Sequence, residues 1–273
     1  TLSTLYLLPR CYRRLDPRKI CGVRIDALGM GLCLGNVGAG GRILVLDSSM
    51  GMLTGAVLER TGGYAEVTSV TLFGKSGAWE LVKCFNQGPA AQHALRTCVL
   101  ADLLALRDTM RREAAKPDTE RDARRDARLR QDRASPPRTD FKIREAELRD
   151  RITAQFTSLI VVCPWGNVSE LMTKLVPFLE PSAAFVCLHP SAQALAECVP
   201  VLVQARVAAN LQVSGNILRD ILDSNRIYNK SHHERDHYYI YLCRSVRRGT
   251  GNIKCCHCAR TRICSIRDRE GSY

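Results

Sequence analysis

A repeated order of short β-favouring runs and helical segments constrains the fold of this chain more than any other feature of its sequence. Residues 43–46 are an apolar run that ends at Asp47, and residues 67–73 are a second β-favouring run. Apolar strands separated by helices are typical of a parallel sheet that is buried on both faces. Three helices are expected around these two strands, over about residues 25–37, 53–60 and 78–85.

The alternation stops at about residue 87 and resumes in the second half of the chain. Further strands are expected over residues 159–163, 183–188, 211–213 and 238–243, and helices over residues 169–178 and 192–206, the latter capped by residues 189–191 (His-Pro-Ser). The last two strands could be antiparallel. This order predicts an α/β fold, a Rossmann-like sheet of the methyltransferase type with helices on both faces.

Positive charge is concentrated at the two ends of the chain and in one internal segment. The net charge of the 273 residues is +13 at pH 7. Residues 1–24, 107–151 and 226–273 contribute +5, +4 and +7, whereas the remaining residues sum to −3. Basic segments around a slightly acidic body favour a polyanionic partner, most often a nucleic acid. The alternative is a solvated surface without a partner.

The internal segment is expected to add little to the hydrophobic core. It is rich in Arg, Asp, Glu and Ala, and residues 135–137 (Ser-Pro-Pro) break any single long helix. We therefore predict a mobile, partly helical insertion, and residues 110–150 are expected to be dispensable for folding. Four parts are expected: an approach segment from a missing N-terminal domain (1–24), the Rossmann-like domain (25–106 and 152–243), the charged insertion (107–151) and a basic, Cys-rich, disordered tail (244–273).

The cysteine pattern gives no metal site. Of the thirteen cysteines, most are scattered, and several lie within apolar runs. Cys255 and Cys258 form a CxxC pair around His257, but a zinc site needs a second ligand pair at a defined distance. A reducing compartment is the simplest interpretation of so many unpaired thiols. No apolar stretch is long enough to cross a membrane, so no membrane partner is expected.

Two stretches of the chain resemble a known family. Residues 24–37 (RIDALGMGLCLGNV), 40–47 (GGRILVLD) and 51–63 (GMLTGAVLERTGG), followed by 158–162 (SLIVV) and 176–182 (VPFLEPS), are similar to the non-catalytic subunit of eukaryotic tRNA (adenine-58) N1-methyltransferase. The resemblance covers about residues 20–90 and 155–230, and the charged insert recurs at the same place.

The resemblance implies a subunit that does not perform the chemistry itself. The family pairs with a catalytic subunit of the same fold in a nuclear hetero-oligomer, expected to be a heterotetramer, which binds tRNA. The methyl donor, adenosylmethionine, is expected in the catalytic partner. Arg219 and Arg226 match basic positions in the family's loop after the fifth strand, and Lys230 and Arg235 extend that segment. These four are the candidate RNA-binding residues; the alternative for the two arginines is ion pairing with nearby aspartates.

The loop after the first strand lacks the features of a cofactor site. An active methyltransferase needs small residues there and an acidic residue at the end of the second strand. This loop runs from Asp47 through Gly51 to Gly55, includes Met50, Met52 and Leu53, and is degenerate; residues 72–74 contain no carboxylate. We predict a packing turn, without cofactor-binding, catalytic or metal-binding residues. Two other functions are left open: an autonomous adenosylmethionine-dependent RNA methyltransferase, and a protein-only interaction module.

Overall fold

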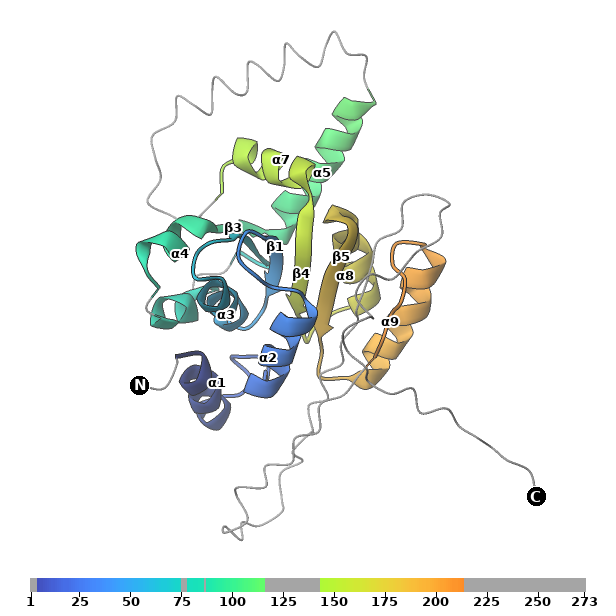
Figure 1. Cartoon of the computed structure of the whole chain (residues 1–273). Helices are drawn as coiled ribbons and strands as arrows, with labels where there is room; N and C mark the ends of the chain where they lie inside the picture. The colour runs from blue at the N-terminus through green and yellow to red at the C-terminus, as the bar shows by residue number, and fades with distance from the viewer. Residues whose placement is uncertain (1–3, 75–77, 86, 116–142, 214–273) are drawn as a thin grey trace, which may run out of the picture.

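Five parallel strands form the centre of the molecule in a computed structural model that describes residues 4–74, 78–85, 87–115 and 143–213. Their order is β3-β2-β1-β4-β5 (Figure 1). The chain adds β2 and β3 on one side of β1 and then crosses over to add β4 and β5 on the other side. This arrangement confirms the Rossmann-like α/β fold. The strands are β1 (Arg42–Asp47), β2 (Glu66–Thr71), β3 (Leu95–Val99), β4 (Phe156–Val162) and β5 (Leu179–Leu188).

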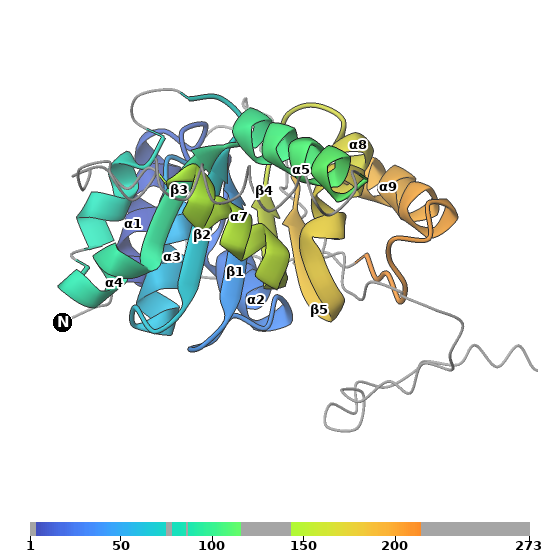
Figure 2. The same cartoon turned by 90° about the horizontal axis from the view of Figure 1, so that it is seen from above.

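Helices cover both faces of the sheet, as the apolar strands predict. Leu44 and Leu46 of β1 belong to one buried cluster, whereas Ile43 and Val45 belong to the other. Figure 2 shows α5 and α8 on one side of the strands and α2 on the other. On the first face lie α5 (Leu100–Ala114), α7 (Glu145–Ala154), α8 (Val168–Leu175) and α9 (Ala192–Gln204); α2 (Ile25–Leu34) and α3 (Met52–Thr61) lie on the second.

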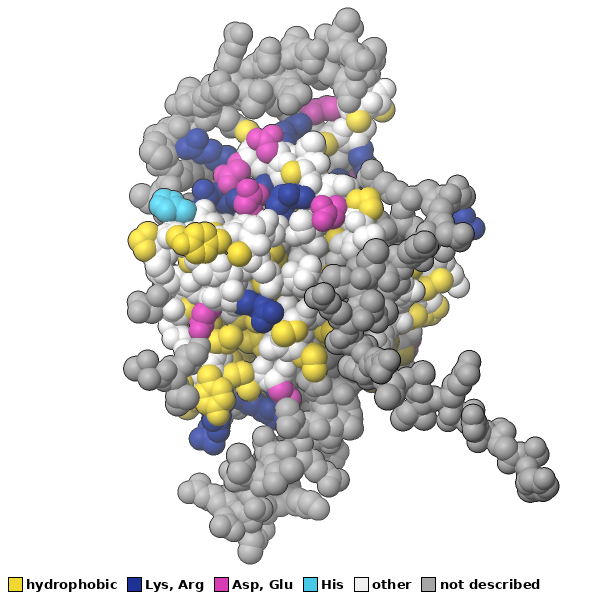
Figure 3. Space-filling model, in the orientation of Figure 1, with side chains coloured by type: hydrophobic (Ala, Val, Ile, Leu, Met, Phe, Trp, Pro, Cys, Tyr) yellow, Lys and Arg dark blue, Asp and Glu magenta, His cyan; other side chains and the backbone are white. Residues whose placement is uncertain are grey.

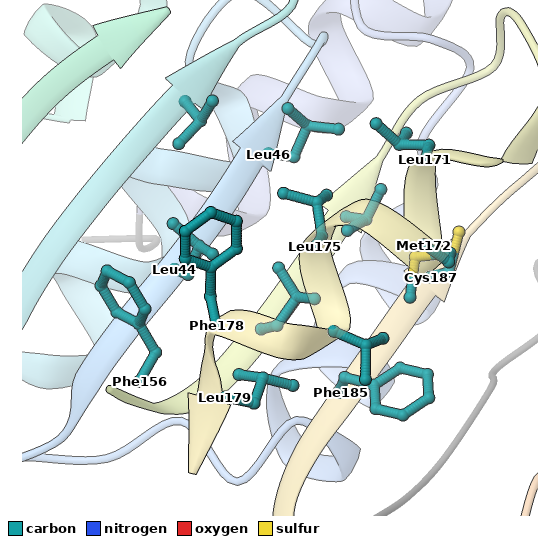
Figure 4. Packing of buried hydrophobic residues seen from close by; sticks show 14 of the residues in the cluster. Leu44, Leu46, Phe156, Leu171, Met172, Leu175, Phe178, Leu179, Phe185 and Cys187 are labelled. Atoms are coloured by element: carbon teal, nitrogen blue, oxygen red, sulfur yellow. The ribbon is translucent and has the colours of Figure 1, made fainter. Parts of the chain in front are cut away.

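Helix α8 shows how the sequence pattern becomes packing. Its apolar positions recur at helical spacing, and Leu171 and Leu175 point from the helix toward the sheet near Leu46 (Figure 4). Leu175 and Leu46 are fully buried. Burying one such side chain contributes about 1.5–3 kcal/mol. The Asn167 side chain accepts a hydrogen bond from the Glu170 amide at 3.2 Å and caps the helix.

Strand β3 is the strand that the sequence did not predict; the helices on either side of it, over residues 89–94 and 100–114, and the helix over residues 4–15 were not predicted either. Its five residues do not form a continuous apolar run, because Arg96 and Thr97 interrupt it. The strand lies at the edge of the described sheet. There Arg96 reaches past the strand and pairs with Glu147 at 2.9 Å, so its charge is neutralised without entering the core. Periodicity alone therefore could not identify this strand.

Two further elements differ from the sequence prediction. The helix expected over residues 78–85 is the short 3₁₀ helix η1 (Glu80–Phe85), which folds over the loop after β1. Residues 211–213 were expected to be a strand and adopt no regular structure. The strand expected over residues 238–243 lies outside the described residues. The remaining short elements are α1 (Thr4–Leu15), α4 (Pro89–Ala94) and η2 (Val176–Phe178).

The two ends of the charged segment are packed helices, contrary to the expectation that it adds little core. Helix α5 continues to Ala114, and α7 begins at Glu145. Within the segment, Leu148 is buried in the larger core cluster and Met110 packs against it. The expected boundaries at residues 107 and 151 therefore fall inside helices that pack against the core. Residues 110–150 include Leu148, so deleting the whole range would remove a buried side chain; the dispensability of this range for folding stays a prediction.

Among the described helices, none is both long and apolar enough to cross a membrane.

Candidate functional site

The loop after β1 lies where ligands bind in folds of this type. In an open parallel sheet, the crevice forms at the carboxyl ends of the strands where the strand order reverses. Here that point is between β1 and β4, and β1 ends at Asp47. The loop turns sharply because Met50 and Gly51 both adopt positive φ, 57° and 90°. A side chain at Gly51 would also meet Val82 Cγ2 at 2.7 Å, so only glycine fits this position.

The Asp47 carboxylate is fully occupied by its own loop. The residue is 2% exposed. Its Oδ1 accepts hydrogen bonds from the Ser49 amide at 2.7 Å and the Ser49 hydroxyl at 2.6 Å. Its Oδ2 accepts from the Thr54 amide at 2.8 Å and the Thr54 hydroxyl at 2.7 Å. The carboxylate thus satisfies one backbone donor in the first turn of α3, where negative charge is stabilised by the helix dipole.

A chain of donors links this carboxylate to the second strand and to a tryptophan. Trp79 Nε1 donates to Ser69 Oγ at 2.8 Å, and the Ser69 and Thr54 hydroxyls lie 2.8 Å apart. Because the single Thr54 hydroxyl proton goes to Asp47, Ser69 must donate to Thr54. Each group therefore donates toward the carboxylate, an arrangement that strengthens every member of the chain. We call Asp47, Ser49, Thr54, Ser69 and Trp79 the Asp47 network.

The space beside the glycines is filled by the chain itself. A side chain at Gly55 would overlap the Phe85 ring, and the Leu81 amide donates to the Met50 carbonyl at 2.9 Å. Leu81, Phe85 and Met52 are buried in one small cluster. The close partner of Gly51 and Gly55 is therefore the segment around η1, which covers the loop.

The residues at this edge of the sheet do not fit adenosylmethionine, the cofactor expected for a fold of the methyltransferase type. The Asp47 carboxylate makes four hydrogen bonds inside the protein, and η1 lies against the glycines. Strand β2 ends at Thr71 and is followed by Leu72 and Phe73, so no carboxylate stands where ribose hydroxyls would be held. Tight packing, and a carboxylate whose hydrogen bonds are all made within the protein, are typical of a structural turn.

The thiols near this edge are not poised for chemistry. The Cys21 thiol donates to the Ser48 carbonyl at 3.1 Å, and the Cys163 thiol donates to the Trp165 carbonyl at 3.0 Å. Burial raises the pKa of both thiols above the ordinary value, and the Asp47 carboxylate raises that of Cys21 further. A nucleophilic cysteine needs a lowered pKa. Both side chains therefore serve as small packed groups.

Two exposed aromatic side chains also lie at the carboxyl ends of the strands. Phe73 follows β2 and is 64% exposed, and Trp165 follows β4 and is 51% exposed. Large exposed apolar side chains beside a sheet edge are suited to contact with a partner. Their exposure could not be predicted from local sequence, since aromatic residues near strands are more often buried.

The predicted RNA-binding residues and the tail are outside the described part of the chain. Arg219, Arg226, Lys230 and Arg235 all lie beyond residue 213, as do Cys255 and Cys258. Within the described residues, no three His, Cys, Asp or Glu side chains come together as a metal site.

Comparison with known proteins identifies the relatives of this chain. Residues 2–131 match the model of the Gcd10p family. Over 83 residues, 30% of this chain and 16% of the relative, the sequence is 39% identical to the tRNA (adenine(58)-N(1))-methyltransferase non-catalytic subunit trm6 of Dictyostelium discoideum. Over 61 residues, 22% of this chain and 12% of the relative, it is 36% identical to the subunit of the same name, TRM6, from Mus musculus.

These matches confirm the resemblance and also limit it. The chain spans less than a fifth of the length of the curated relatives that it matches. Among solved structures, the tRNA (m1A58) methyltransferase TrmI from Aquifex aeolicus aligns with 82% of this chain and 66% of its own, at 16% identity and a TM-score of 0.47. The O-methyltransferase TomG from Streptomyces achromogenes aligns with 90% of this chain and 91% of its own, at 12% identity and a TM-score of 0.49.

Proposed function

Because residues 2–131 match the Gcd10p family, we propose that this chain belongs to a non-catalytic, tRNA-binding and scaffolding subunit of a tRNA (adenine-58) N1-methyltransferase. In this proposal a catalytic subunit of the same fold supplies the methyl-donor site and the catalytic residues. The named relatives support the reaction and the non-catalytic role. We further propose that the complex is a nuclear heterotetramer.

The closed loop after β1 is the observation that carries the non-catalytic role. Opening it for a cofactor would break hydrogen bonds to a buried carboxylate, each of which contributes about 1.5–3 kcal/mol. It would also displace Leu81 and Phe85 from their buried cluster. A cofactor would have to offset both costs. The autonomous methyltransferase is therefore the less favoured alternative.

The scaffolding role is supported by the edge of the sheet at β5. This ten-residue strand pairs with β4 on one side, and no other described strand pairs with it. A long strand edge without a partner tends to be covered in the native assembly. We propose that a surface including residues 184–188 of β5, with residues 210–214 and 238–243, contacts the catalytic subunit.

The tRNA contacts proposed from the sequence are Arg219, Arg226, Lys230 and Arg235. A guanidinium can hold a phosphate through two parallel hydrogen bonds, which makes arginine suited to this role. The competing role for the first two is ion pairing with Asp220 and Asp223. Replacing Arg219 and Arg226 with Glu in the assembled complex should weaken tRNA binding and leave assembly intact. Unchanged tRNA affinity at low salt would favour the ion-pair role.

Two measurements test the proposed function. First, the chain is expressed alone and with a catalytic subunit; size-exclusion chromatography should show a joint peak, with better solubility than for the chain alone. A stable monomer that ignores the catalytic subunit would overturn the scaffolding role. Second, isothermal titration of the chain with adenosylmethionine should give no saturable heat, with the catalytic subunit as positive control. Micromolar binding to the chain alone would instead support the autonomous methyltransferase.

A further inference from the structure

Five cationic side chains on and after α1 form the largest group without ion-pair partners in the described part of the chain. Elsewhere in these residues, seven Lys and Arg side chains are held in ion pairs with carboxylates. None of the five pairs with a described carboxylate. We call them the basic ridge: Arg10, Arg13, Arg14, Arg18 and Lys19.

The ridge faces outward because the opposite side of α1 is packed. Pro9 is buried, and Leu5, Leu8 and Tyr12 pack against the cluster formed by Ile20, Met52, Leu81 and Phe85. Four of the five ridge side chains are exposed, and Arg13 is half-buried. In Figure 3, dark blue side chains lie at the lower edge of the molecule around the position of α1. The helix is therefore docked on the described core with most of its charges exposed, and Arg10 also donates to the Tyr6 hydroxyl.

Within its own stretch of sequence, the charge of the ridge is nearly uncompensated. Asp16 is the only acidic residue between Arg10 and Lys19, so this stretch carries a net charge of +4. Asp16 Oδ1 accepts a hydrogen bond from the Arg18 amide at 3.2 Å, which holds the turn that brings Arg18 and Lys19 beside the end of the helix. Exposed like charges within one Debye length, about 8 Å at physiological salt, repel each other. A polyanion relieves this repulsion.

The composition of the ridge favours a phosphate backbone. Four of its five cations are arginines, whose planar guanidinium groups match phosphate oxygens in a bidentate geometry. A membrane surface fits less well, because a basic helix binds there by inserting its apolar side, and that side of α1 is already packed in the fold. An acidic protein surface is also negatively charged, but it does not present the regular series of phosphate groups that several neighbouring arginines can bind in a bidentate manner.

We infer that the basic ridge is a phosphate-binding surface for structured RNA. The inference rests on the proposed function. It adds a second RNA contact, about 200 residues before Arg219 and Arg226 in the sequence. Its chemistry is neutralisation of backbone phosphates, which carries no base specificity by itself. Each phosphate that the ridge neutralises releases counterions, so the contact must be steeply dependent on salt.

The test compares two double variants in the complex with the catalytic subunit. Arg14→Ala with Arg18→Ala removes two exposed ridge charges. Arg111→Ala with Arg112→Ala removes two exposed charges from the last turn of α5 and serves as the matched control. Binding of unmodified tRNA is measured by filter binding at several salt concentrations, and assembly is followed by size-exclusion chromatography.

We expect the ridge variant to bind tRNA on the order of 10-fold more weakly at 0.1 M salt, with the slope of log K against log salt reduced by about 1.5. The α5 variant should bind within 2-fold of the original complex. Arg14→Lys with Arg18→Lys, which keeps the charge, should restore most of the salt slope while losing some affinity.

The outcomes separate this inference from the proposed function. If the unaltered complex assembles and binds tRNA in a salt-dependent way but the ridge and α5 variants bind equally well, the ridge inference is overturned and the proposed function stands. If the ridge variant instead loses the catalytic subunit on the column, the ridge is a protein contact and the inference is again wrong. If the unaltered chain neither assembles nor binds tRNA, both proposals fail.

Discussion

Two polar regions of this molecule lie at very different depths. In the Asp47 network, Asp47 and its Ser and Thr partners are buried around β1, α3 and β2, and both carboxylate oxygens of Asp47 accept hydrogen bonds. The ion pairs of α5 and α7 lie at the surface, where Arg149 contacts Glu113 at 2.8 Å and Glu145 at 3.3 Å. Figure 3 shows such mixed charges across the upper part of the molecule.

The difference in depth decides how much each region contributes to stability. Removing a buried carboxylate leaves the donors that it accepted from unsatisfied, which is costly in a medium of low polarity. An exposed ion pair competes with water and salt, and contributes about 0–1 kcal/mol. We therefore expect the loop to depend on its polar groups, whereas α7 depends on apolar packing despite its many charges.

The largest effect is expected for Asp47→Ala. The substitution leaves the Ser49 and Thr54 amides and hydroxyls without their acceptor, and should lower the free energy of unfolding by about 3–5 kcal/mol. Urea unfolding followed by circular dichroism measures the change. Asp47→Asn, which keeps one acceptor oxygen, should cost less. A loss below about 1 kcal/mol for Asp47→Ala would show that the network is replaceable by water.

Leu148→Ala tests whether apolar packing holds α7. The side chain is 4% exposed and lies in the larger core cluster, so its truncation should cost about 2–4 kcal/mol. The same unfolding measurement applies. Ile152→Ala, at a partly buried position of the same helix, should cost less and serves as a graded control. An effect no larger than that of a surface substitution would restore the expectation that this segment adds little core.

Gly55→Ala tests the closure of the loop by η1. The new methyl group would overlap the Phe85 ring, and overpacking of this kind should cost about 1–3 kcal/mol. The smaller side chain of Phe85→Leu, combined with Gly55→Ala, should recover part of the loss in a double-mutant cycle. If the two changes in unfolding free energy were strictly additive, the Phe85 ring and the loop would not be coupled.

The smallest effect is expected for Arg149→Ala. Both of its ion pairs are partly exposed, so the loss should stay below about 1 kcal/mol and shrink further when salt is raised from 0.05 to 0.5 M. Asp47→Ala should show no comparable salt dependence. If Arg149→Ala matched Leu148→Ala in cost, the ion pairs would be a principal support of α7, and the contrast between the two regions would disappear.

Much of the fold could be predicted from local sequence pattern, and the exceptions share a physical cause. Strands β1, β4 and β5 contain apolar runs because helices cover both of their faces. Within the expected cap at residues 189–191, Ser191 accepts a hydrogen bond from the Ala194 amide. Strand β3 lacks such a run because Arg96 finds its carboxylate on α7, 51 residues later in the chain. That pairing depends on tertiary structure and leaves no local signal.

The site shows the same division. The positions of Gly51 and Gly55 predict a packing turn, yet nothing near them in the sequence indicates that η1 would supply Val82 and Phe85 as the packing partners. The net charge of residues 1–24 predicts a basic surface, but only the docking of α1 shows that most of the basic ridge is exposed and that it has no ion pair within the described residues.

The position of Trp79 has a practical consequence for studies of this protein in solution. The chain contains only two tryptophans, and Trp165 is exposed. Replacing Trp165 with Phe would leave Trp79 as a single built-in fluorophore, with its indole N–H bonded to Ser69 inside the polar chain that ends at Asp47. Its emission would shift to longer wavelength when water reaches the loop. The molecule therefore carries its own optical sensor of whether the turn after β1 is open or shut, in the free chain and in any complex whose other subunits have had their tryptophans replaced.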